Sequence, residues 1–252
     1  MNIKNLALLW VTVTLSLTLT GCSTSKNPEQ SPDKIAQAHT ELAGSYYGRQ
    51  QYAVALQELG VALQADPNYA PGYGVRGLVR MALHEDELAE ADFKRSLRLD
   101  PKSSESHNNY GWFLCQRGKP KESLAQFAEA VSNPLYATPE VAYANAGMCA
   151  IEAGDMQLAG AHLQRALILR PGMPEALFGL SKVAFVQNDF NSAKNYFFRF
   201  QQAMNELNAA QLWLAVQIER KVFDRNSEAS YTLQLQKRFP DSREVQLLQA
   251  GQ

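Results

Sequence analysis

The sequence predicts an all-α solenoid of about six helix-turn-helix repeats, and three observations support this fold class. A short pattern occurs twice, as Asn109-Tyr110-Gly111 and Asn145-Ala146-Gly147. Each copy is expected to open a helix that ends at a charged, glycine-containing turn, at Arg117-Gly118-Lys119 and at Ala153-Gly154-Asp155. The other two observations are a proline that recurs at a fixed interval and the lack of any stretch with the two-residue alternation of a strand.

The recurring proline sets the length of the repeat. Pro67 and Pro101 lie 34 residues apart, and Pro171 follows after 70 more, which is two periods plus two residues. A 34-residue helical repeat with a small residue in its first helix, alanine in its second and a terminal proline is the tetratricopeptide signature. We therefore expect a right-handed superhelical solenoid. Its markers, unit by unit, are Ala43, Tyr46, Ala55, Leu59, Ala62 and Pro67; Gly77, Ala89, Phe93 and Pro101; Gly111, Phe127 and Ala130; Gly147, Ala159, Leu163, Ala166 and Pro171; Ser181, Ala193 and Phe197; and a degraded sixth unit over 215–240.

The repeat has a physical cause. Two helices of about a dozen residues cannot bury their apolar faces alone, so the small residues let them approach closely while leucine and phenylalanine fill the seam. Stacked units then share one continuous core. The two extra residues fall in 133–139, where Pro134 ends one helix and Pro139 starts the next.

The first residues of the chain indicate export and lipidation. One basic residue, Lys4, precedes an uncharged apolar run over 6–19, which is short for a membrane span. We interpret residues 1–21 as a signal peptide. Leu19-Thr20-Gly21-Cys22 resembles a bacterial lipobox, in which the Cys22 thiol receives diacylglycerol and the new amine is acylated after cleavage. The alternative is a signal anchor with an incidental cysteine.

Residues 22–33 are expected to form a lipidated, flexible tether to the solenoid domain over 34–252. The tether has no large apolar side chain, so it cannot offset the entropy of ordering. Stable anchoring needs about two acyl chains, and three would hold the protein permanently. Ser23 follows the cysteine, and the lack of aspartate there fits, by resemblance to other bacterial lipoproteins, the periplasmic face of the outer membrane.

Composition argues against a nucleic-acid partner. The chain has 24 basic residues, one of which is Lys4 in the signal peptide, so 23 would remain beside 25 acidic ones. Binding to phosphate needs a concentrated basic face, which this balance does not favour. The chain is 46% apolar, which is normal for a globular protein, and one solenoid accounts for its length.

Cys115 and Cys149 lie in the expected first helices of units three and four. These helices should be neighbours, and in an oxidising periplasm two thiols can pair if their Cα atoms come within about 7 Å. We favour a disulfide over two buried free thiols. A catalytic thiol is a third interpretation, but neither cysteine has a histidine in a recognisable arrangement.

No catalytic or metal-binding arrangement is evident, so we predict no enzymatic activity, no cofactor and no small-molecule substrate. His39, His84, His107 and His162 are scattered without metal-ligand spacing. The acidic run over 85–87 is expected to be a solvated turn.

The functional surface should therefore come from the solenoid, whose first helices line a concave groove. One face of the unit-three helix carries Asn108, Trp112 and Gln116, and the equivalent face of unit four carries Ala144, Met148 and Glu152. Such a mixed surface suits a peptide or helix, although packing between repeats would also explain it. Unit five adds Phe178, Lys182 and Phe185. The candidate protein-binding residues are Asn108, Asn109, Trp112, Gln116, Asn145, Met148 and Glu152.

Several segments resemble the PilF/PilW family of type IV pilus biogenesis lipoproteins. They are the runs over 108–115, 133–136 and 145–149, followed by Leu212-Trp213-Leu214, Leu233-Gln234-Leu235 and Phe239-Pro240-Asp241-Ser242. The resemblance covers essentially the whole mature chain. Departures from the usual repeat are Ser123 in place of alanine and Arg76 and Arg80 where leucine and tyrosine are common.

The resemblance implies a pilotin, a lipid-anchored adaptor that helps the type IV pilus secretin reach the outer membrane and assemble into its multimer. The alternative is a lipid-tethered scaffold for peptidoglycan enzymes, which would share the anchor and the repeats. A periplasmic hydrolase would need a nucleophile or metal site, and the sequence shows neither.

Overall fold

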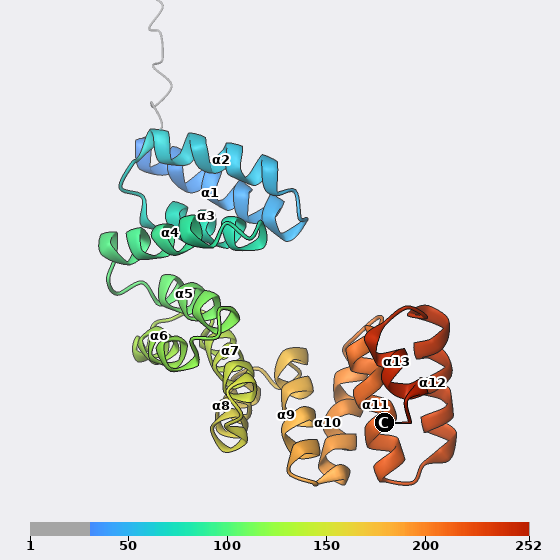
Figure 1. Ribbon diagram of the computed structural model, residues 1–252. Helices are drawn as coiled ribbons and strands as arrows, with labels where there is room; N and C mark the ends of the chain where they lie inside the picture. The colour runs from blue at the N-terminus through green and yellow to red at the C-terminus, as the bar shows by residue number, and fades with distance from the viewer. Residues whose placement is uncertain (1–30, 252) are drawn as a thin grey trace, which may run out of the picture. The chain divides into compact units, whose positions relative to one another are not determined.

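The computed structural model describes residues 31–251. The expected signal peptide, the lipidation site Cys22 and tether residues 23–30 lie outside the described residues, so they stay predictions. The described part contains thirteen α-helices and no strand (Figure 1). The helices are α1 (Pro32–Gly48), α2 (Tyr52–Ala65), α3 (Ala70–Ala82), α4 (Asp86–Leu99), α5 (Ser104–Gln116), α6 (Pro120–Ser132), α7 (Pro139–Glu152), α8 (Met156–Leu169), α9 (Pro174–Val186), α10 (Phe190–Gln202), α11 (Ala209–Lys221), α12 (Arg225–Arg238) and α13 (Arg243–Gln249).

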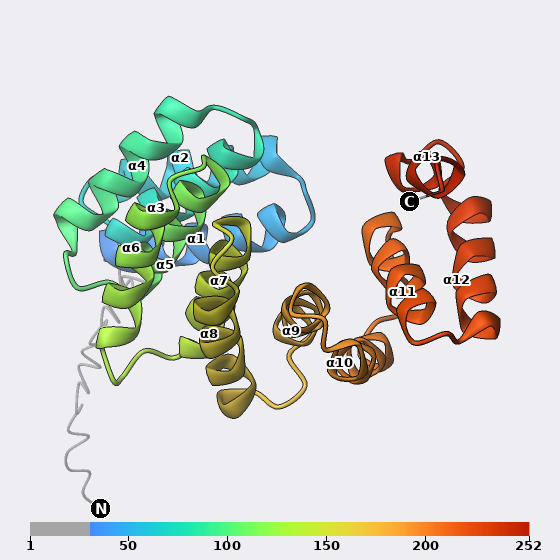
Figure 2. The same ribbon diagram turned by 60° about the horizontal axis from the view of Figure 1, so that its bottom comes forward.

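Twelve of these helices form six consecutive pairs, from α1 with α2 to α11 with α12. Each pair packs on the next, and Figures 1 and 2 show the pairs following one another in chain order. The short helix α13 contacts both α11 and α12. The predicted all-α architecture of six helix pairs is therefore confirmed over residues 31–251.

The repeated Asn-x-Gly pattern lies in the middle of its helices, so the expectation that it opens them is wrong. The first helix of unit three, α5, begins at Ser104, because the Ser103 hydroxyl accepts a hydrogen bond from the Ser106 backbone N–H. The first helix of unit four, α7, begins at Pro139, whose fixed φ suits the first helical turn. The helix starts are thus set by a capping serine in α5 and by a first-turn proline in α7, both of which precede the repeat's small residue.

Two expected boundaries also differ from the structure. The solenoid begins at Pro32, two residues before Lys34, because a first-turn proline followed by Asp33 is a favourable helix start. The sixth pair begins at Ala209, six residues before Ala215. There Asn208 and Gln211 form a reciprocal capping box, which the repeat pattern did not indicate.

The turn inside each helix pair has one residue with a left-handed backbone. These residues recur at intervals of 34, 34, 36, 34 and 35, so they mark the repeat more regularly than the prolines do. Glycine adopts this conformation without steric cost, whereas a bulky residue is a clear outlier. Only two of the six turns show glycine, and the sixth has a phenylalanine. The residues are Gln50, His84, Gly118, Gly154, Asn188 and Phe223.

Small residues allow the two helices of a pair to approach closely, as the sequence predicts. A Cβ atom added at Gly77 would lie 2.7 Å from the Phe93 ring, and one added at Gly111 would lie 2.9 Å from the Phe127 ring. At Gly147 the distance to Leu163 Cγ would be 2.5 Å. The aromatic or leucine side chain of the second helix thus occupies the space that a side chain on the first would need.

Serine occupies a small-residue position of the repeat in two units and bonds across the helix pair. Ser123 stands in place of the usual alanine, and Ser181 is the expected marker of unit five. The Ser123 hydroxyl of α6 donates to the Gly111 carbonyl oxygen at 2.8 Å. In unit five, the Ser181 hydroxyl of α9 donates to the Ala193 carbonyl oxygen at 2.9 Å. Both serines are fully buried, and their hydroxyl groups are satisfied without separating the helices.

The two arginines of unit two share one buried partner. Arg76 donates two hydrogen bonds to the Asp92 carboxylate, at 2.7 and 2.9 Å, and Arg80 donates a third at 2.6 Å. Asp92 lies on α4 and is 3% exposed. The bidentate contact and the second guanidinium compensate for burial of its charge. An ionic cluster therefore replaces the apolar contact that is common at this place in the repeat.

The close approach in unit four predicts a specific loss of stability. Gly147→Ala should lower the free energy of unfolding by about 1–3 kcal/mol, because the new methyl group overlaps Leu163. Gly60→Ala is the matched control, since a Cβ there meets nothing within 4 Å in the middle of α2. The free energy of unfolding of the control variant should rise by up to about 1 kcal/mol, because alanine is more stable than glycine inside a helix. Urea denaturation measures both, and equal effects would contradict the packing argument.

The ionic cluster predicts non-additive mutations. Asp92→Ala alone should lower the unfolding free energy by about 3 kcal/mol, because two partly buried guanidinium groups lose their partner. Adding Arg76→Leu and Arg80→Tyr should restore most of that loss, since the site becomes apolar. Thermal and urea denaturation check this. If the triple variant is the least stable, the compensation argument is wrong.

Candidate functional site

A groove lies between the first helices of units three and four, α5 and α7. Four of the seven sequence-predicted binding residues line it together: Trp112, Gln116, Met148 and Glu152. Its volume is about 570 Å³, within the range of sites that hold small ligands or short peptide segments. The four-residue spacing places these side chains on one face of each helix. The packing of α5 against α7 brings the two faces together. Cys115 and Gly118 complete the lining.

The three asparagines of the prediction form a hydrogen-bonded chain instead. Asn145 donates from its amide nitrogen to the Asn108 side-chain oxygen at 3.0 Å, and Asn108 donates to the Asn109 side-chain oxygen at 3.4 Å. Asn108 is buried, and none of the three is among the residues that line the groove. These amides therefore join the two first helices, which is the local role that asparagine commonly has at this position.

Trp112 and Met148 combine packing with exposure. Trp112 is partly buried against the cluster formed by Cys115, Phe127, Ala146 and Cys149, and its remaining surface lines the groove. The Met148 side chain likewise packs against the core of unit four while it forms part of the groove wall. The two interpretations of these residues, packing and binding, are thus compatible. Their fixed positions give the groove a preformed apolar base.

The unit-five residues predicted for the same face lie differently. Lys182 on α9 reaches the Glu152 carboxylate at 3.6 Å, so it borders the groove. Phe178 packs on Phe200 with ring centroids 5.1 Å apart, and Phe185 packs on Phe190 at 5.6 Å. Phe178 and Phe185 therefore belong to the packing of unit five. The residues that line the groove come from units three and four.

A disulfide joins Cys115 and Cys149 in the structure. Their Cα atoms lie 5.7 Å apart, within the range that a disulfide needs without backbone movement. The bond links α5 directly to α7 and closes a segment of 34 residues. Because Cys115 also lines the groove, the bond fixes the two helices that form the walls. The sequence indicated the pairing but not its place in the groove wall.

The described histidines make separate local contacts. His39 bonds Glu58 at 2.6 Å, His107 bonds Gln126 at 2.8 Å, and His162 lies 6.0 Å from the Tyr143 ring. Burial lowers the pKa of His162. Within residues 31–251 no group of histidine, cysteine or carboxylate side chains could hold a metal ion. Each helix in the same range is too short or too polar to cross a membrane.

Comparison with known proteins identifies relatives along nearly the whole chain. A family model described as a tetratricopeptide repeat matches residues 93–125. The type IV pilus assembly protein PilF of Pseudomonas aeruginosa is 27% identical over 241 residues, which cover 94% of this chain and 95% of that protein. The crystal structure of PilW, a widely conserved type IV pilus biogenesis factor, is 33% identical and superimposes with a TM-score of 0.77.

The PilW match covers 85% of this chain and 98% of that one. This chain belongs to the PilF/PilW family. The structure of Pseudomonas aeruginosa PilF agrees, with 26% identity, a TM-score of 0.78 and coverage of 88% of this chain and 99% of that one. Membership in the PilF/PilW family confirms the tetratricopeptide superhelix that the 34-residue period predicted. Its named members are proteins of type IV pilus assembly and biogenesis.

The disulfide predicts a redox-dependent stability. Replacing both Cys115 and Cys149 by serine should lower the unfolding free energy by about 2–4 kcal/mol, because a closed loop of this length restricts the unfolded chain. Urea denaturation with and without dithiothreitol measures the loss. The reductant should affect the wild type and leave the double variant unchanged. Two free thiols in the oxidised native protein would contradict the pairing.

Proposed function

We propose that this protein is a lipid-anchored, non-enzymatic adaptor of type IV pilus biogenesis that binds the pilus secretin. The acyl chains on Cys22 would hold it at the periplasmic face of the outer membrane. The groove between α5 and α7 would bind a segment of the secretin subunit, and the adaptor would promote delivery and multimer assembly of the secretin.

One observation carries this proposal: the match to PilW and PilF extends over nearly the full length of both relatives. A repeat architecture alone would not select a partner, because tetratricopeptide repeats serve many unrelated functions. The lipobox-like motif ending at Cys22 supports the lipid anchor.

The chemistry of the groove supports recognition of a peptide segment. Trp112 and Met148 supply apolar area, while Gln116 and Glu152 supply exposed polar groups at the edge. Aromatic side chains in a preformed depression are common centres of binding energy. Among the described residues that line the groove Glu152 is the sole charged one, and the bordering Lys182 already pairs with it, so a strongly charged ligand has little to pair with. An apolar segment with a few polar groups fits best.

Complementation of a deletion strain tests the proposal. Without the gene, secretin multimers and twitching motility should be lost. A variant carrying Gln116→Ala and Glu152→Lys should restore less secretin multimer than the wild type, and Trp112→Ala should weaken secretin binding by at least about tenfold. Immunoblotting of unboiled membranes and a pull-down with purified secretin measure these effects.

The exposed pair of substitutions controls for folding, because neither side chain is buried. Arg165 on the second helix α8 is exposed and provides a matched outer position for photo-crosslinking. Secretin should be labelled from Trp112 and not from Arg165.

Cys22→Ser should release the protein from the outer membrane. Intact secretin multimers with altered peptidoglycan in the deletion strain would instead support a scaffold for cell-wall enzymes.

A further inference from the structure

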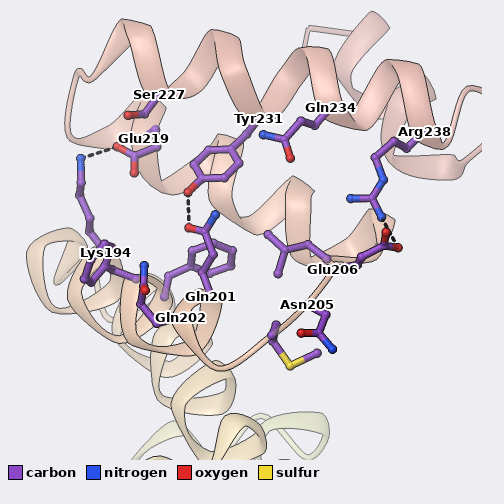
Figure 3. A pocket seen from close by; sticks show the side chains of 14 residues that line it. Lys194, Gln201, Gln202, Asn205, Glu206, Glu219, Ser227, Tyr231, Gln234 and Arg238 are labelled. Atoms are coloured by element: carbon purple, nitrogen blue, oxygen red, sulfur yellow. Dashed lines mark hydrogen bonds and ion pairs between the residues drawn. The ribbon is translucent and has the colours of Figure 1, made fainter.

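A second cleft lies between two second helices, α10 and α12, on different elements from the groove of units three and four. Its volume is about 590 Å³. The six-residue linker 203–208 forms one wall, whereas the linkers that follow α2, α4 and α8 have four residues. Figure 3 shows side chains from α10, the linker and α12 around the same space.

The charged groups around this cleft already have partners. Lys194 binds the Glu219 carboxylate at 2.6 Å and Arg238 binds Glu206 at 3.0 Å (Figure 3). Lys194 also binds the Asp224 carboxylate at 3.0 Å. The hydrogen bond that Lys194 donates to the Glu219 carboxylate raises the pKa of Lys194, so this ion pair persists at neutral pH. An ionic ligand would have to displace these contacts. The cleft therefore favours an uncharged occupant.

Three carboxamides around the cleft have no partner among residues 31–251. They belong to Gln202 at the end of α10, Asn205 in the linker and Gln234 on α12. A fourth, Gln201, accepts a hydrogen bond from the Tyr231 hydroxyl at 2.7 Å. A carboxamide offers both a donor and an acceptor, which is the pair of groups that a peptide unit presents. Three such groups on two sides of one cleft can hold a main chain passing between them.

The cleft also has exposed apolar surface. Phe198 on α10 is 60% exposed and Met204 in the linker is 36% exposed, although both are large hydrophobic side chains. Phe197 and Leu207 are buried and also line the cleft. Apolar surface rimmed by polar groups marks sites of interaction with other proteins. An aliphatic or aromatic side chain of a ligand would bury this surface.

We propose that the cleft between α10 and α12 binds a short, uncharged segment of a partner protein in extended conformation. The carboxamides of Gln202, Asn205 and Gln234 bond its main chain, and one apolar side chain of the segment packs on Phe198 and Met204. A helical ligand fits less well, because its own hydrogen bonds occupy the main-chain groups that the carboxamides would contact. This surface is independent of the proposed secretin groove.

Selection of short linear peptides displayed on phage, with the full-length chain as target, tests this proposal. Enriched peptides are synthesised with a fluorophore, and their affinity is measured by fluorescence polarisation. At least one enriched peptide should bind about tenfold more weakly to a variant with Asn205→Ala and Gln234→Ala. The same peptide should lose a similar factor when its main-chain nitrogens are methylated at alternate residues. Added salt should change its affinity little.

Gln236→Ala is the matched control, because Gln236 lies on the same helix, is exposed and is not among the residues that line the cleft. It should leave the affinity unchanged, as should Trp112→Ala in the other groove. Circular dichroism should show unaltered folding of all variants. The proposal is overturned if no peptide is enriched. It is equally overturned if every enriched peptide is indifferent to the cleft substitutions or tolerates methylation of its main chain.

Discussion

The close approach of two helices within each repeat is the constraint on which the rest of the structure depends. Where Gly77, Gly111 and Gly147 lack a side chain, a ring or a leucine from the second helix fills the space. Each unit of a solenoid contacts only its neighbours, so the spacing inside one pair sets the position of the next. The positions of the helices that form the groove and the cleft both follow from this packing.

Polar residues that occupy the seam of the repeat have hydrogen-bond or ionic partners close by, which compensate for their burial. Ser123 and Ser181 bond carbonyl oxygens across the helix pair, and Arg76 and Arg80 share the Asp92 carboxylate. In each case a polar group enters the seam together with its partner, which avoids the cost of an unsatisfied buried group. The repeat therefore tolerates varied residues as long as the volume and the hydrogen bonds of the seam are maintained.

The two candidate binding surfaces use different parts of the repeat. The groove of units three and four is built from first helices, and the disulfide between Cys115 and Cys149 holds those helices together. The cleft of units five and six is lined mainly by second helices and the six-residue linker 203–208, and three of its carboxamides have no partner within residues 31–251. A protein with two such surfaces can contact two segments of one partner or two different proteins. Family membership links the chain to type IV pilus biogenesis, and the proposed secretin segment would occupy the first surface.

The sequence by itself determined the all-α class, the 34-residue period and the seam residues, because these depend on spacing along one chain. It favoured a disulfide between the two cysteines, which the structure then showed. It also placed Trp112, Gln116, Met148 and Glu152 on matching helix faces. It could not show that Asn145 bonds Asn108, since that contact joins two units. It also could not show that Phe223 adopts a left-handed backbone, because a phenylalanine does not indicate that conformation. Only the tertiary structure showed the cleft of α10 and α12, because its lining comes from four segments, α10, the linker, α11 and α12, whose separation depends on how the last two repeats pack.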